Sequence, residues 1–168
     1  MPDAGNINRI SLLAAANACM FVFGVVVLLM GSLLPSWQFT YSRSGNLGLL
    51  PLAGILVSTV LVGPILDLIG AKKVLAVALG LVVPLPGLMP ALGSYSELAA
   101  AAFIYGLGGG GLNTTTNAQV ADMSVAGCAA ALNLLAFFCS LGAISAPLML
   151  SSVAGNLSTS VVLRGLAI

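Results

Sequence analysis

Four asparagine side chains lie inside the long hydrophobic stretches of this chain, and their amides are the groups best suited to chemistry. They are Asn17, Asn113, Asn117 and Asn133. A side-chain amide both donates and accepts hydrogen bonds, so several amides at one level could bind a neutral polyol. Such a site discriminates strongly, because a buried amide without a partner is penalised.

The spacing of these residues favours a common level. Asn113 and Asn117 are four residues apart, so both project from one face of a helix. Asn17 lies roughly 9 Å into its stretch at 1.5 Å per residue, and Asn133 lies at a similar depth. We hypothesise that the four residues form a polar layer along a substrate path. The alternative is that they join helices structurally, at about 0.6 kcal/mol for each contact.

The composition indicates which elements position these amides. Hydrophobic residues make up 60% of the 168 positions, charged residues make up 5%, and histidine is absent. A soluble domain has about a quarter of its residues charged, and it does not contain successive apolar runs of about 20 residues. The net charge of +1 and a single adjacent lysine pair also argue against nucleic-acid binding. The bilayer is therefore the expected environment.

The apolar runs predict an all-α integral membrane protein, a helical bundle that forms one transmembrane domain over residues 1–168. We expect five full spans and the start of a sixth, at about residues 11–34, 47–69, 74–92, 96–120, 128–151 and 161–168. Pro84, Pro86 and Pro90 predict a kink or break in the third span. Gly106 and Gly110 favour a close helix crossing in the fourth.

The basic residues predict the orientation of this multi-pass protein in the cell membrane. With a cytoplasmic N-terminus, Arg9, Lys72 and Lys73 lie inside and Arg43 and Arg164 lie outside. This distribution is a weak bias that agrees with the positive-inside rule.

The short turn between the second and third spans carries one acid and two bases. It contains Gly63, Asp67, Gly70, Lys72 and Lys73. Gly63 allows close helix approach, Gly70 suits the left-handed turn, and Asp67 offers an anion to a neighbouring cation or helix N-terminus. The pattern resembles the cytoplasmic loop between helices two and three of major facilitator superfamily transporters. That resemblance implies a gate role for Asp67, although Leu68 and Ala71 stand where the family usually has a basic residue.

Three further segments are similar to fucose-permease-like sugar transporters of the same superfamily. They are Gly106–Asn117, Ala131–Phe138 and Gly142–Pro147. Transporters of this superfamily contain two six-helix halves around a midplane site. The resemblance therefore implies that this chain is an incomplete N-terminal half, and that the missing C-terminal half is a partner.

The expected function is secondary active or facilitative transport of a small polar solute, with a sugar as the candidate, by alternating access. The alternatives are an efflux carrier for amphipathic compounds and a non-transporting membrane scaffold subunit. A coupling proton is a candidate partner, but Asp67, Glu97 and Asp122 all fall at expected helix ends. The coupling acid could lie elsewhere in the protein, transport could be facilitative, or a terminal acid could be drawn inward.

An enzyme is not expected. The sequence has no histidine, no intramembrane pair of acids and no metal-ligand spacing, so we expect neither a catalytic site nor a metal or cofactor. Gly106, Gly108 and Gly111 match a dinucleotide-binding pattern, but neither the preceding strand nor the later acid is present. We interpret these glycines as helix-packing residues.

Overall fold

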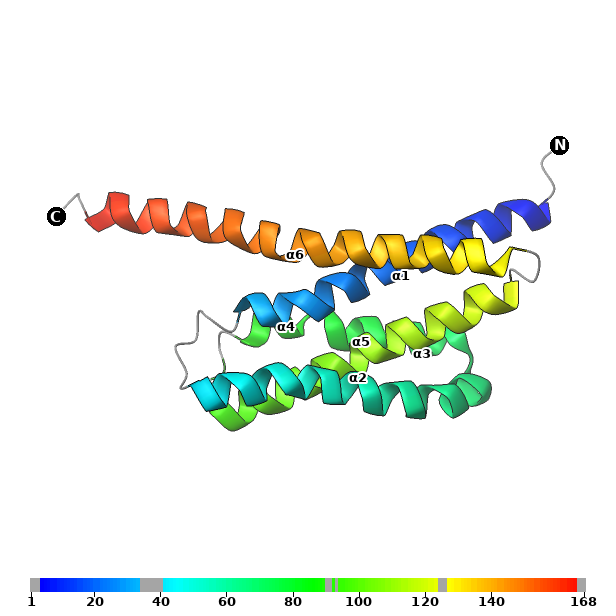
Figure 1. Ribbon diagram of the computed structural model, residues 1–168, viewed down its shortest axis with the longest axis horizontal. Coiled ribbons are helices and arrows are strands. Elements are labelled where there is room, and N and C mark those ends of the chain that lie inside the picture. Colours follow the sequence, from blue (N-terminus) through cyan, green and yellow to red (C-terminus); the bar gives the residue numbers. More distant parts are fainter. Residues whose placement is uncertain (1–3, 34–40, 90–91, 93, 124–126, 166–168) are drawn as a thin grey trace.

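The protein is a bundle of helices, seen in a computed structural model that describes residues 4–33, 41–89, 92, 94–123 and 127–165 (Figure 1). The helices are α1 (Ala4–Leu33), α2 (Tyr41–Ile69), α3 (Ala71–Val82), α4 (Leu85–Leu88), α5 (Tyr95–Met123) and α6 (Cys128–Gly165). Four segments are long and apolar enough to cross a membrane: Ser11–Leu29, Gly45–Ile69, Ala71–Leu88 and Cys128–Leu148. The prediction of an all-helical membrane protein is confirmed at this level.

Large apolar side chains cover the outer faces of the bundle. Val60 is 74% exposed and Leu68 is 83% exposed on α2, while Phe137 is 56% exposed and Ile144 is 60% exposed on α6. A soluble protein rarely exposes contiguous apolar surface of this kind, because its contact with water is unfavourable. Lipid tails are the solvent that suits these faces.

The helix boundaries correct two expectations. α2 begins at Tyr41, six residues before the expected start of the second span at about residue 47. The proposed stub at 161–168 is not a separate sixth span, because residues 161–165 continue α6. Only residues 166–168 of that stub, like Leu34 of the first span, lie outside the described residues. No proline follows Pro147, so nothing in this small polar stretch forces the backbone out of the helix.

The third span is interrupted where its prolines begin, as expected. α3 ends at Val82, the turn at Val83 and Pro84 follows, and α4 begins at Leu85. Pro90 lies outside the described residues.

The fourth of the five expected full spans, at about residues 96–120, is not among the apolar segments. α5 has 29 residues, but its glycines, threonines and asparagines make it less hydrophobic than the other long helices. By length and composition the described chain therefore has four membrane-crossing segments, and not five with the start of a sixth.

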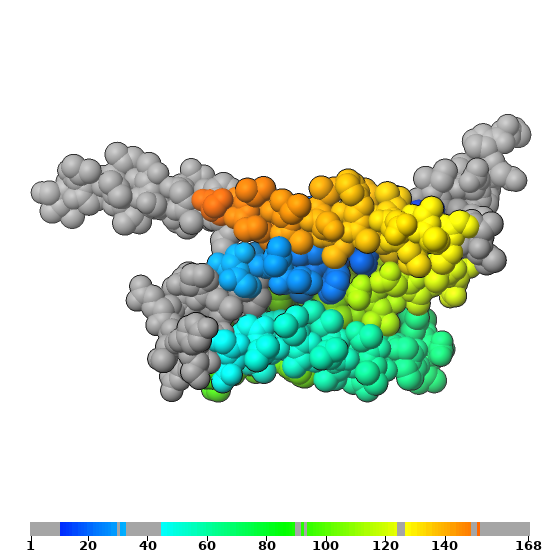
Figure 2. Space-filling model, viewed as in Figure 1, coloured from blue at the N-terminus to red at the C-terminus, as the bar shows by residue number. Residues whose placement is uncertain are grey.

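α5 is the central helix of the bundle and packs against α1, α2, α3 and α6. Leu112, Thr115, Thr116 and Val120 on this helix are fully buried. In Figure 2 the yellow-green end of α5 is visible between α6 and α2. Because α5 packs against four helices, its buried Thr115 and Thr116 meet protein rather than lipid.

Two helix pairs cross at glycines, and in both pairs the glycines are offset from each other in the same way. A Cβ atom added to Gly24 on α1 would collide with the Cys139 carbonyl oxygen on α6, and one added to Gly142 would collide with the Phe21 carbonyl oxygen. Each clash is with the carbonyl three residues before the partner glycine. Only glycine permits backbones to approach this closely.

The pair formed by α2 and α5 repeats this arrangement. A Cβ on Gly54 would collide with the Phe103 carbonyl oxygen, and one on Gly106 would collide with the Pro51 carbonyl oxygen. Again the carbonyl lies three residues before the partner glycine. α1 and α6 run in one direction and α2 and α5 run in the other (Figure 1). The two pairs therefore share one glycine register and run in opposite directions.

Candidate functional site

A groove between α1 and α6 contains Asn17, the most buried of the four predicted site asparagines. The Asn17 side chain is 8% exposed, and its Oδ1 atom has no hydrogen-bond partner within the described part of the chain. The groove has a volume of about 720 Å³ and is lined by Ala14, Asn17, Ala18, Phe21, Val22, Leu134 and Phe138. A buried acceptor without a partner is costly, so a hydrogen-bond donor that reached this atom from the groove would be bound favourably.

The crossing glycines create this groove. Asn17 lies seven residues before Gly24, two turns along the same helix face. Leu134 and Phe138 lie eight and four residues before Gly142 on α6. The two helices touch at the glycines, and the groove lies on the N-terminal side of this contact among larger side chains. The result is one amide among aromatic and aliphatic groups, which suits a ligand with both a polar edge and an apolar face.

A second groove occupies the equivalent place between α2 and α5. It has a volume of about 390 Å³ and is lined by Asn46, Leu49, Leu50, Ala53, Tyr95 and Ala99. Its residues have the same spacing from the crossing glycines as those of the first groove. Asn46 lies eight residues before Gly54, as Leu134 does before Gly142. Ala99 lies seven residues before Gly106, as Asn17 does before Gly24. Because the two helix pairs run in opposite directions, the two grooves lie toward opposite ends of the bundle (Figure 1).

Asn113 and Asn117 are brought together, but they bind each other. The Asn117 Nδ2 atom donates to the Asn113 side-chain oxygen at 2.8 Å and to the Asn113 carbonyl oxygen at 2.8 Å. Both side chains are partly buried. Neither residue lines the groove around Asn17. The expected common layer is therefore divided into this pair on α5 and the separate amide on α1.

Asn133 lies on the exposed face of α6 and does not line the groove of Asn17. Phe137, one turn further along this face, is 56% exposed. An amide surrounded by lipid tails lacks hydrogen-bond partners, so polar groups at such positions normally face protein or a water-filled path.

The turn between α2 and α3 has the expected glycine geometry. Gly70 has φ 81° and ψ 153°, a conformation that is essentially restricted to glycine, and its N–H donates to the Leu66 carbonyl oxygen at 3.0 Å. Asp67, Lys72 and Lys73 are all exposed. The close approach expected at Gly63 is not made, because a Cβ there would meet no described atom within 4 Å. Its neighbour Pro64 is accommodated within the continuous helix α2.

The sequence reasoning missed the aromatic residues of the groove and the buried threonines. Phe21 follows Asn17 by four residues, so its position on the same helix face could have been found from spacing alone. Phe138 required knowledge of how α6 packs on α1. The Oγ1 atoms of Thr115 and Thr116 are buried beside α5 glycines and, among the described residues, have no hydrogen-bond partner.

Comparisons with protein-family models, with curated proteins and with solved structures found no match.

Proposed function

We propose that this chain belongs to the N-terminal half of a major facilitator transporter and moves a small polar solute, with a sugar as the candidate, by alternating access. The motif resemblance of the turn after α2 and of the segments around Gly106 and Gly142 supports the family. In this proposal α5 also crosses the membrane, and a C-terminal half covers the exposed face of α6 that carries Asn133. The N-terminus lies in the cytoplasm.

The observation that carries the proposal is the inverted pair of glycine crossings. Gly24 with Gly142 and Gly106 with Gly54 meet in the same register, on helix pairs that run in opposite directions. Many secondary transporters contain inverted repeats, and a shared register on helix pairs of opposite direction is what such a repeat would produce. A scaffold subunit has no need of such an arrangement.

Asn17 is the residue we place first along the solute path. Its Oδ1 atom lacks a partner among the described residues, and it faces a groove that is large enough for a small molecule. A solute hydroxyl would donate to this oxygen, while Phe21 and Phe138 would contact the apolar face of a sugar ring. Asn113 and Asn117 serve as helix-stabilising groups or as groups that a solute engages by displacing their mutual bond.

The apolar lining of the groove favours one second candidate, an efflux carrier for amphipathic compounds. Apart from Asn17, every lining side chain is apolar. Such a groove binds a flat apolar body and leaves one hydrogen bond to fix its orientation. The two candidates differ in which solute Asn17 recognises, and not in the fold.

Uptake by the complete reading frame tests the proposal. Cells expressing the wild type, Asn17→Leu or Ala18→Leu are compared for radiolabelled monosaccharide uptake and for ethidium efflux; both variants alter the groove, but only the first removes an amide. We expect Asn17→Leu to lose most sugar uptake and Ala18→Leu to lose less. Loss of ethidium efflux alone would favour the amphipathic carrier. Absence of both activities in the wild type, with normal membrane insertion, would refute a transport function.

A separate variant distinguishes a transporter from a scaffold. Asp67→Asn keeps the shape of the exposed side chain and removes its charge. In a transporter we expect a changed maximal rate, because the family resemblance assigns this acid to the gate. In a scaffold we expect no change in the association of partner subunits.

A further inference from the structure

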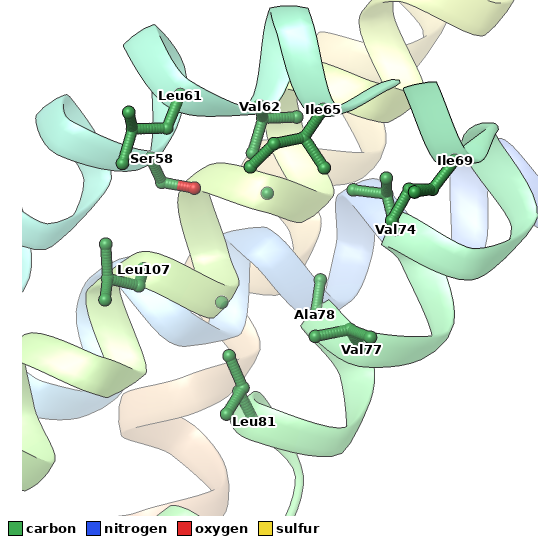
Figure 3. A pocket seen from close by; sticks show the side chains of 12 residues that line it. Ser58, Leu61, Val62, Ile65, Ile69, Val74, Val77, Ala78, Leu81 and Leu107 are labelled. Carbon is green, nitrogen blue, oxygen red and sulfur yellow. The ribbon is translucent and has the colours of Figure 1, made fainter. Parts of the chain in front are cut away.

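A third groove lies between α2, α3 and α5, away from both helix crossings. It has a volume of about 200 Å³ and is lined by Ser58, Leu61, Val62, Ile65, Ile69, Val74, Val77, Ala78, Leu81, Leu107, Gly108 and Gly111 (Figure 3). Only Ser58 contributes a polar side chain. In Figure 3 the labelled side chains of α2 and α3 face each other across the opening, with α5 behind them.

The shape of this groove follows from the turn at Gly70. One residue separates α2 from α3, so the two helices are held together at the turn and separate beyond it. The groove is deep at its base because Gly108 and Gly111 of α5 have no side chains there and Ala78 of α3 has a short one. Along α2 the lining runs from Ile69 to Ser58, 11 residues or roughly 16 Å. A long, narrow and apolar slot of this kind fits an unbranched hydrocarbon chain.

The open end of the slot lies beside two cations. Ile69 and Val74 line the groove on either side of the turn, and Lys72 and Lys73 stand between them in the sequence. Both lysines are exposed, and with Asp67 they give this segment a net charge of +1 (two positive and one negative). Lysine side chains at helix ends extend toward the headgroup region of a bilayer.

We propose that this groove is a binding site for an anionic phospholipid of the surrounding bilayer. One acyl chain occupies the slot between α2 and α3, and the phosphate contacts Lys72 and Lys73 at the turn. Basic pockets between membrane helices bind anionic headgroups in this way. The site is separate from the groove of Asn17, which lies between α1 and α6. It is independent of the proposed transport function, because neither the solute nor the glycine crossings enter the argument.

Charge decides between an anionic and a zwitterionic lipid. The slot itself would accept an acyl chain from either, because its contacts are with hydrocarbon alone. A phosphatidylcholine headgroup carries its own cation, which the two lysines would repel. Two lysines near an anionic headgroup correspond to roughly thirtyfold tighter binding at low salt. We therefore expect selectivity to depend on the lysines and occupancy to depend on the slot.

Native mass spectrometry of the protein released from detergent micelles tests both parts. The protein is titrated with dioleoyl phosphatidylglycerol or with dioleoyl phosphatidylcholine. The wild type should bind phosphatidylglycerol more tightly, by about tenfold to thirtyfold. The double variant Lys72→Gln with Lys73→Gln should lose this preference for phosphatidylglycerol. Equal binding of both lipids by the wild type would overturn the proposal.

The slot is tested by filling it. Val77 lines the groove and is 60% exposed, whereas Val60 on α2 is 74% exposed and does not line it. Val77→Trp should lose binding of both lipids, and the matched control Val60→Trp should bind as the wild type does. If circular dichroism shows that Val77→Trp is not helical, Leu61→Trp fills the same slot from α2. Retained phosphatidylglycerol binding by a folded, slot-filled variant would also overturn the proposal.

Discussion

Replacing a crossing glycine with alanine should destabilise the bundle far more than the same change in open space. At Gly106, an added Cβ would overlap the Pro51 carbonyl group, and at Gly110 it would lie 2.8 Å from the Ile55 carbonyl oxygen. Ordinary contacts begin at 3.4 Å, so even at Gly110 the atoms must separate by 0.6 Å (3.4 minus 2.8). The obstructing atoms belong to a helix backbone, which cannot rotate away as a side chain can. α2 and α5 must therefore move apart along their contact.

The expected cost is about 1–3 kcal/mol, the usual penalty for overpacking a core. For a chain of this length each kcal/mol lowers the melting temperature by roughly 2–4 °C. Gly80→Ala is the matched control, because Gly80 lies inside α3 and a Cβ there would meet nothing within 4 Å. Alanine is also the better helix former, by about 1 kcal/mol, so this control should melt at or slightly above the wild-type temperature.

Thermal unfolding in detergent, followed by helical circular dichroism, provides the comparison. We expect Gly106→Ala to melt at least 2 °C, and up to roughly 12 °C, below the wild type. Gly24→Ala should show a similar loss, because its clash with Cys139 on α6 repeats the register of the Gly106 clash. A Gly106→Ala protein that melts with Gly80→Ala would refute the close crossing. A loss at Gly106 without a loss at Gly24 would refute the equivalence of the two helix pairs.

Three further predictions concern the turn and the amides. Gly70→Ala should cost about 1–3 kcal/mol, because φ 81° with ψ 153° is strained for alanine, and the same thermal melt measures it. Asn17→Leu should raise the melting temperature, since it removes a buried acceptor that has no partner in the described chain. The same variant should lose most uptake, and unchanged uptake would exclude Asn17 from the site. Asn113→Leu should cost only about 0.2–0.5 kcal/mol, the worth of a side-chain hydrogen bond between residues four apart on one helix. A large loss of uptake with a melting change this small would return Asn113 to the solute path.

The sequence was sufficient for the features that depend on local chemistry. Gly70 ends a helix because few other residues adopt its backbone conformation, and Pro84 interrupts a helix because it lacks an N–H group. Gly106 and Gly110 were expected to meet another helix, and both face α2. None of these conclusions requires knowing which helices are neighbours.

The grouping of the four asparagines could not be predicted from the sequence, because it depends on how each helix is rotated about its axis. Asn17 and Asn113 were expected to converge from their depth along the helix, but depth does not define the direction of a side chain. Asn17 lies on the same helix face as Gly24, and this face packs against α6. Asn113 and Asn117 lie close to the face of α5 that carries Gly106, and that face packs against α2. The crossing glycines fix both rotations, and so they separate the amides.

The run of glycines on α5 has a simple explanation in the position of that helix. Consecutive residues on a helix point about 100° apart, so a run of glycines offers smooth contact in several directions at once. Gly106 and Gly110 admit α2, Gly108 and Gly111 admit α3, and Gly109 admits α1. A helix with one close neighbour needs glycine only every fourth residue, whereas a central helix needs it on successive residues. In the proposed transporter all four of these helices belong to the same half, so the run of glycines packs that half closely around α5.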